Sequence, residues 1–202
     1  MPIVFLGTNE QWNEISKTNA DNECIRVHSL DELYSTQGTL YMYLLNDEAL
    51  VDFSKFTAPV LINAVCNTLH GLGVPNNILR INGWHSFLQR PIWEIAGNVT
   101  DDVRLQLSTL QKKIIEVPDE IGFASTKVVS MIINEAYFAL QENVSTKEEI
   151  DIAMKLGTNY PYGPFEWASI IGVQHIYMLL HQLSVNQKRY TPATLLKEEA
   201  QA

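Results

Sequence analysis

The sequence predicts an α/β domain with a mostly parallel sheet, followed by an all-α domain. One observation is a series of short apolar, β-rich segments, separated by turn residues, in the first half of the 202-residue chain. These segments are apolar almost without interruption, which is typical of strands buried on both faces of a parallel sheet. Near residue 120 the pattern changes to the apolar period of amphipathic helices. We therefore expect two domains, residues 1–120 and 121–202.

Strands and helices alternate in the first half. The segments predicted as strands are residues 3–7, 24–29, 39–46, 59–65, 77–85, 92–97 and 114–119. A short helix is expected within residues 9–18, and an amphipathic helix is expected over residues 101–113. This order is typical of a parallel sheet with helical connections.

The second half is predicted to be helical throughout. The expected helices cover residues 123–143, 145–157, 164–172, 173–184 and 191–200. Their ends follow from a capping box at Ser145 and Glu148, a terminal glycine at Gly157, Pro164 in a first turn, and an N-cap at Thr191 before Pro192.

The composition excludes several functional classes. A formal net charge of −9 repels phosphate backbones and anionic lipid surfaces, so neither a nucleic acid nor a membrane is expected as a partner. No apolar segment approaches the roughly 20 residues that span a bilayer. The start of the chain lacks the basic region of a signal peptide, so we expect a cytoplasmic protein. Cys24 and Cys66 lack metal-site spacing, and no metal is predicted.

The segment NGWHSFLQRPIWEIAG, residues 82–97, contains one histidine and one glutamate nine residues apart, His85 and Glu94. Histidine suits proton transfer because its unperturbed pKa of about 6.5 is close to working pH. A catalytic base with an orienting carboxylate is one interpretation. A histidine on a strand with a surface glutamate is the other, and the spacing alone does not separate them.

The second half is similar to a known family. The segment from residue 122 to residue 172 contains the sequences GF, INEA, IDIAMKLGTNYPYGPFE and ASIIG, and RYTPATLL follows at residues 189–196. It resembles the C-terminal helical domain of 3-hydroxyacyl-CoA dehydrogenases. The resemblance implies a shortened Rossmann-like domain over residues 1–120, a homodimer formed through the helical domain, and a role in fatty acid metabolism.

The resemblance also implies a set of site residues. His85 is placed as the catalytic base, which takes the proton of a 3-hydroxyl group while hydride leaves for a nicotinamide, and Glu94 is placed as its partner carboxylate. Asn63 and Cys66 fall in the substrate crevice. Thr126 falls where the family has a catalytic asparagine.

The cofactor site of the family is eroded in this sequence. A dinucleotide site requires the pattern G-x-G-x-x-G after the first strand, and the chain has GTNEQW. Gly7 remains, but Asn9 and Trp12 replace the other two glycines, and Glu10 adds negative charge. Ser29 stands near the position of the acidic residue that binds the ribose. With Gly7, Asn9 and Ser29 as the remaining positions, no cofactor is expected.

Three functional hypotheses follow. The first is a divergent 3-hydroxyacyl-CoA dehydrogenase-like protein with lost or impaired NAD-dependent oxidation, in which the His–Glu pair serves binding or proton chemistry on a small acyl or keto ligand. The second is an active NAD-dependent dehydrogenase of 3-hydroxyacyl-CoA or a short 3-hydroxy acid, which would bind NAD(H). The third is a non-catalytic dimeric binding or structural protein. Whether the chain is an enzyme stays open; if it is, the resemblance implies an oxidoreductase.

Overall fold

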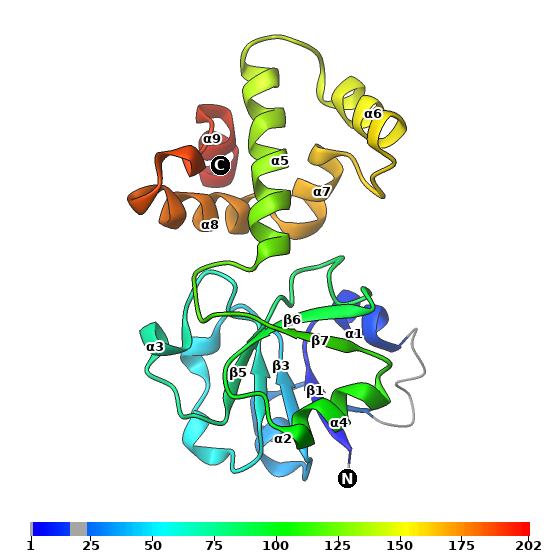
Figure 1. The fold of residues 1–202 in the computed structure, drawn as a ribbon, viewed down its shortest axis with the longest axis vertical. Coiled ribbons are helices and arrows are strands. Elements are labelled where there is room, and N and C mark those ends of the chain that lie inside the picture. Colours follow the sequence, from blue (N-terminus) through cyan, green and yellow to red (C-terminus); the bar gives the residue numbers. More distant parts are fainter. Residues whose placement is uncertain (1, 17–23) are drawn as a thin grey trace. The chain divides into compact units, whose positions relative to one another are not determined.

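A computed structural model describes residues 2–16 and 24–202. The chain divides into two compact units at Phe123, an α/β unit and an all-α unit (Figure 1). Residues 17 and 18 of the first expected helix lie outside the described residues. Among the described helices, none combines the length and the apolar character needed to cross a membrane.

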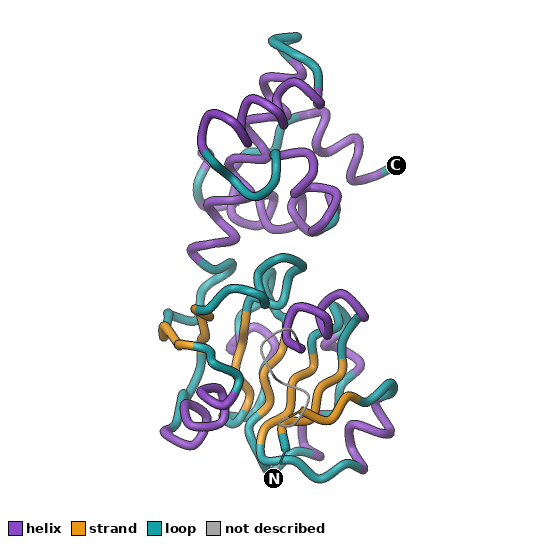
Figure 2. Tube along the Cα trace, turned by 90° about the vertical axis from the view of Figure 1, so that its right-hand side faces the viewer, coloured by secondary structure: helices purple, strands orange, loops and turns teal. Residues whose placement is uncertain are grey.

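The first unit is built on a seven-stranded sheet with the order β2-β1-β3-β4-β5-β6-β7. Figure 2 shows its strands in orange with helices beside them. The strands are β1 (Ile3–Leu6), β2 (Cys24–Arg26), β3 (Leu40–Tyr43), β4 (Val60–Ile62), β5 (Ile78–Ile81), β6 (Ile92–Ala96) and β7 (Lys113–Glu116). Only the β5–β6 pair is antiparallel within this sheet. The predicted mostly parallel sheet is confirmed, with strands shorter than expected.

Helices cover both faces of the sheet. The helices of this unit are α1 (Asn9–Ser16), α2 (Leu30–Ser35), α3 (Leu69–Leu72) and α4 (Asp101–Thr109). Alternate side chains of each strand point to opposite faces, so Phe5 of β1 packs with α1 and α4 while Val4 packs with α2. Because both faces are buried, polar side chains gather at the ends of the strands.

The second unit contains α5 (Ala124–Gln141), α6 (Lys147–Thr158), α7 (Pro164–Ile171), α8 (Val173–Asn186) and α9 (Thr194–Gln201). Pro164 begins α7 as predicted. The capping box of α6 is formed by Thr146 and Glu149, one residue later than expected. Gly157 lies inside α6, and Asn159 ends this helix with a φ of 56°.

The expected N-cap at Thr191 is wrong, because this residue is used elsewhere. Its hydroxyl group donates to the Lys188 carbonyl at 2.6 Å, and its carbonyl accepts from Asn134 Nδ2 at 2.9 Å. Asn134 also accepts from the backbone N–H of Ala193 at 2.8 Å, so this buried amide of the INEA sequence fixes the start of α9.

Asp151 holds the segment GPFE, residues 163–166, which is part of the sequence that resembles the family. Its carboxylate accepts from the backbone N–H groups of Phe165 (2.8 Å) and Glu166 (3.1 Å), which caps the first turn of α7. A side chain at Gly163 would collide with Asp151, so glycine is required there. These residues of the family-like sequence therefore stabilise the helical fold.

Candidate functional site

The carboxyl ends of the parallel strands β1, β3, β4 and β5 meet at one edge of the sheet. Asn63, which follows β4, is buried at this edge. Its Nδ2 donates to the carbonyl of Leu44 (3.3 Å) and to Asn46 Oδ1 (2.7 Å), and its Oδ1 accepts from the N–H of Gly83 (3.0 Å). Asn63 thus connects the ends of β3, β4 and β5, the edge at which such sheets bind ligands.

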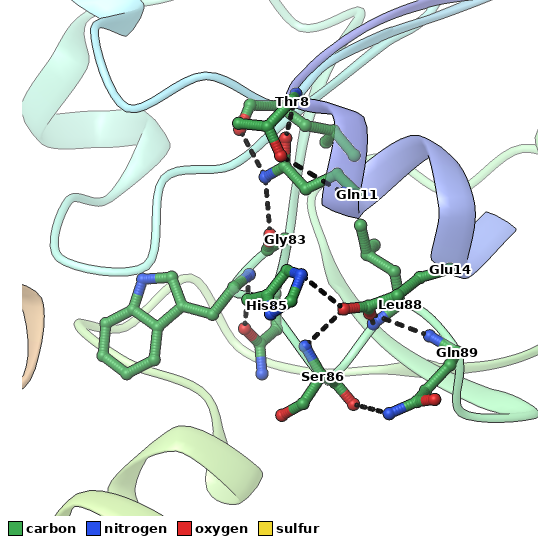
Figure 3. Close-up of polar contacts among 11 residues, drawn as sticks. Thr8, Gln11, Glu14, Gly83, His85, Ser86, Leu88 and Gln89 are labelled. Atoms are coloured by element: carbon green, nitrogen blue, oxygen red, sulfur yellow. Dashed lines mark hydrogen bonds and ion pairs between the residues drawn. The ribbon is translucent and has the colours of Figure 1, made fainter. Parts of the chain in front are cut away.

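Gln11 crosses the same edge from α1. Thr8 and Gln11 form a reciprocal capping pair, with Thr8 N to Gln11 Oε1 at 2.9 Å and Gln11 N to Thr8 Oγ1 at 3.2 Å. The side-chain amide of Gln11 then donates to the carbonyls of Leu44 and Gly83, each at 2.8 Å (Figure 3). Residues that follow β1, β3 and β5 therefore hold the side chain of Gln11 in place.

This arrangement does not fit the diphosphate of a dinucleotide. Such a group needs free N–H groups in the first turn of α1 and open space beside a glycine. A Cβ atom on Gly7 would lie 2.7 Å from Gln11 Oε1, so Gln11 already occupies that space. Hydrogen bonds from its own backbone N–H and from the Thr8 hydroxyl hold the pKa of Glu10 below the ordinary value of 4.5, so a negative charge stands at the helix start.

The other positions at which the family resemblance places the cofactor have local structural roles. Asn9 accepts through Oδ1 from Arg26 Nη2 at 2.6 Å. Ser29 caps α2, because its hydroxyl oxygen accepts from the N–H of Glu32 at 3.2 Å. Trp12 packs against Phe5 with ring centroids 5.3 Å apart.

His85 lies in the loop of residues 82–91 between β5 and β6, and its side chain is 34% exposed. Its Nε2 is 3.4 Å from Oε1 of Glu14, whose side chain is only 8% exposed (Figure 3). The carboxylate beside the imidazole therefore comes from α1, whereas the family resemblance implies Glu94.

Strand alternation explains where Glu94 lies instead. Trp93 and Ile95 of β6 belong to the same core cluster as Ile15 of α1. Glu94, between them, points to the opposite face of the sheet, in register with Ile115 of β7. Strand alternation thus places Glu94 on the face of the sheet opposite α1, and a chemical role for Glu94 stays a prediction.

Glu14 also holds the backbone of the His85 loop. Its carboxylate accepts from three backbone N–H groups, those of Ser86 (2.6 Å), Leu88 (3.0 Å) and Gln89 (3.2 Å). Ser86 has a φ of 78°, a left-handed conformation that costs a non-glycine residue about 1–2 kcal/mol. The hydrogen bond from Ser86 to Glu14 helps to stabilise this conformation, which directly follows His85.

A buried cation holds the other side of the loop. Lys112 donates from Nζ to the carbonyls of Leu88 (2.8 Å) and Arg90 (3.0 Å), and its ammonium group lies 5.1 Å from the centre of the Trp93 ring. Burial lowers the pKa of Lys112, and the negative charge of Glu14 opposes this effect. The loop is thus fixed between a carboxylate and an ammonium group.

The remaining predicted residues lie in different places. Cys66 follows β4, and burial, followed by the charge of Glu48, raises the pKa of its thiol to about 12, so that it is neutral at physiological pH. Thr126 is buried in α5, in the second unit, and its catalytic role stays a prediction. Within residues 2–16 and 24–202, no group of three or more His, Cys, Asp or Glu side chains could hold a metal ion.

A buried ion pair supports the loop that carries Asn63. Arg80 of β5 has no exposed side-chain surface; its Nε donates to the Ala64 carbonyl at 2.8 Å, and its Nη1 lies 2.6 Å from Oδ1 of Asp119. Asp119 also accepts from the N–H groups of Leu69 (3.0 Å) and His70 (3.1 Å), which begin α3. Arg80 therefore connects the end of β4 to the segment after β7.

Sequence reasoning missed Gln11, Glu14 and Lys112. The T-x-x-Q spacing of Thr8 and Gln11 is a capping-box signature that could have placed the start of α1. Gln11, Glu14 and Ile15 follow the i, i+3, i+4 spacing of one helix face, and all three are buried. Two polar residues on that face were a signal of buried hydrogen bonds, whereas nothing in the sequence marked Lys112.

The second unit is similar to a known family. Residues 122–202 match the family model of the 3-hydroxyacyl-CoA dehydrogenase C-terminal domain. The chain is 43% identical to the 3-hydroxyadipyl-CoA dehydrogenase of Escherichia coli over 91 residues, which are 44% of this chain and 19% of that protein. It is 30% identical to a probable 3-hydroxybutyryl-CoA dehydrogenase of Bacillus subtilis over 140 residues, which are 64% of this chain and 49% of that protein. The matches span less than half of either relative.

Solved structures share the fold over nearly the whole chain. The (S)-3-hydroxybutyryl-CoA dehydrogenase of Ralstonia eutropha superposes with a TM-score of 0.66 at 23% identity, covering 92% of this chain and 72% of that one. The 3-hydroxybutyryl-CoA dehydrogenase of Escherichia coli gives a TM-score of 0.66 at 17% identity, covering 97% of this chain and 50% of that one. At these identities the similarity establishes the fold.

Proposed function

We propose that this chain, whose C-terminal domain matches the model of the 3-hydroxyacyl-CoA dehydrogenase family, has lost NAD-dependent oxidation and uses His85 for proton transfer on a small acyl or keto compound. The observation that carries the proposal is Gln11. Its side chain fills the space beside Gly7, and it uses the Thr8 N–H that a diphosphate would need. Glu10 adds a negative charge at the same helix start.

The residues that remain suit acid–base chemistry without a cofactor. The partly exposed imidazole of His85 can accept a proton from a carbon next to a carbonyl group, which leaves an enolate, and can then return a proton to that carbon. A carboxylate beside the ring stabilises the imidazolium that forms in between. The loop that carries His85 is held on both sides, by Glu14 and Lys112, which gives the ring a fixed place.

The proposal is tested on the whole chain by two measurements. Calorimetric titration with NADH, alone and with acetoacetyl-CoA, is expected to show no NADH binding. Acetoacetyl-CoA and acetoacetate in D2O are expected to exchange the hydrogens next to their carbonyls faster than in the blank, as followed by NMR, and His85→Gln should abolish the excess rate.

Either measurement can overturn the proposal. Micromolar NADH binding would favour the active NAD-dependent dehydrogenase. An exchange rate equal to the blank with both compounds would favour the non-catalytic protein.

We also propose that the helical unit forms a homodimer, as the family resemblance implies. A groove of about 550 Å³ follows α5, and its lining residues are Ala124, Lys127, Val128, Met131, Ile132, Glu135, Arg189 and Tyr190. Val128 in this groove is 59% exposed and lines it together with Met131 and Ile132, so the groove has an apolar surface that a second copy could cover.

Light scattering is expected to give twice the chain mass of 22.9 kDa. Val128→Asp should shift the protein to a monomer. Val144→Asp, at a 68% exposed position outside the groove, should leave the dimer unchanged. A wild-type monomer would contradict the proposal.

A further inference from the structure

We propose that Glu14 is the positioning residue of His85: its carboxylate accepts the Nε2–H of the imidazole and leaves Nδ1 as the nitrogen that takes the proton. The inference rests on the proposed function of His85 in proton transfer. The partner carboxylate then comes from helix α1, and Glu14 is not among the site residues expected from the sequence.

The direction of the Glu14 carboxylate is fixed by the loop that it faces. Oε1 accepts from the Ser86 N–H at 2.6 Å and lies 3.4 Å from His85 Nε2, while Oε2 accepts from Leu88 and Gln89. Because both oxygens are held by backbone groups, the carboxylate cannot rotate away from the ring. Figure 3 shows the imidazole of His85 directed toward this carboxylate.

The 3.4 Å separation is within the range of an ion pair but longer than an ordinary N–H···O hydrogen bond of about 2.7–3.2 Å. Such contacts often shorten when the reacting complex forms and the imidazole becomes charged. With Glu14 at Nε2, the neutral ring carries its proton on Nε2. Among the described residues, none donates a hydrogen bond to Nδ1, so its lone pair is free for a substrate proton.

Two acidic groups of α1 act on the ring. Glu14 is the ion-pair partner of His85, and Glu10 interacts with His85 electrostatically. Lys112 interacts with the Glu14 carboxylate. Glu14 is therefore the acidic group in direct contact with the ring.

The test is NMR of the full chain with ¹⁵N-labelled histidine, in wild type, Glu14→Gln and Glu94→Gln. Two-bond ¹H–¹⁵N spectra distinguish the two neutral tautomers, and wild type is expected to show His85 as the Nε2–H form. The population of the Nε2–H form should fall in Glu14→Gln, because a neutral amide oxygen accepts a hydrogen bond more weakly than a carboxylate. Glu94→Gln should leave the tautomer of His85 unchanged.

Several outcomes overturn the inference. One is an Nδ1–H tautomer in wild type, and another is a tautomer that changes in Glu94→Gln but not in Glu14→Gln. Glutamine keeps one acceptor oxygen for the loop, and hydrogen exchange of residues 86–89 shows whether the loop stays closed. If the loop opens in Glu14→Gln, the inference is tested by the tautomer of wild type and by the Glu94→Gln variant. None of these measurements needs a substrate, so a protein without deuterium exchange activity would overturn the proposed function alone.

Discussion

Replacing Asp119 by alanine is expected to lower the free energy of unfolding of the first unit by about 3 kcal/mol. The guanidinium of Arg80 has no exposed surface, and Asp119 is its ion-pair partner at 2.6 Å. Removing the carboxylate leaves a buried charge without a counter-ion. It also removes the acceptor for the N–H groups of Leu69 and His70. We expect a loss at the lower end of the range for breaking a buried ion pair, because the Asp119 side chain is 26% exposed.

Urea unfolding followed by tryptophan fluorescence measures this effect. A Trp167→Phe background restricts the signal to the first unit, since the chain's other tryptophans are Trp12, Trp84 and Trp93. Combining Asp119→Ala with Arg80→Met removes both charges, so the double variant should lose less stability than the two single losses added together. Strictly additive losses would mean that the ion pair contributes nothing.

The same pair predicts an acid dependence. Burial alone would raise the pKa of Asp119, but the N–H groups of Leu69 and His70, together with the Arg80 charge, outweigh it and hold the pKa below the ordinary value of 3.8. A lowered pKa gives stability that is present above pH 3.8 and is lost as the pH falls through the lowered value. The stability difference between wild type and Asp119→Asn should therefore shrink in this acid range.

Glu14→Ala is expected to cost about 3–5 kcal/mol, since each buried N–H group left without an acceptor costs about 1–3 kcal/mol. The groups affected are the N–H donors of Ser86, Leu88 and Gln89. Lys112 would also lose the carboxylate that favours its charged form. Urea unfolding in the Trp167→Phe background gives the total cost, and hydrogen exchange of residues 82–91 shows whether it arises in the loop.

Glu94→Ala is the matched control for this variant, because it also removes a glutamate carboxylate, here from a half-buried residue of β6. Its expected cost is below about 1 kcal/mol. Lys112→Met should increase hydrogen exchange in the loop as well, because the carbonyls of Leu88 and Arg90 lose their donor. Equal losses for Glu14→Ala and Glu94→Ala would contradict the role of Glu14 as the anchor of the loop.

Most of the fold could be predicted from apolar patterns and family-like sequences. The strands around Val4, Leu61 and Ile95 were recognisable because burial on both sheet faces makes them apolar throughout. Helix ends were less predictable. Ser145 and Thr146 both have hydroxyl groups suited to capping α6, and only packing selects Thr146.

The candidate site was predictable only in part. Asn63 and His85 follow recognisable strands, so their place at the carboxyl edge could be inferred from the order of the strands. The partner of His85 could not, because strand alternation turns Glu94 to the far face while Glu14 approaches from a helix. A contact across more than 70 positions of sequence leaves no local spacing to detect.

The supports of His85 also determine when the site can form during folding. The hydrogen bonds from the loop to Glu14 join residues 72, 74 and 75 positions apart, and Lys112 reaches back 24 positions to Leu88. Contacts between distant residues require large loops to close first, so they tend to form slowly. During synthesis the loop stays without its cation until residue 112 has left the ribosome. We therefore expect the His85 site to be among the last parts of the sheet domain to assemble.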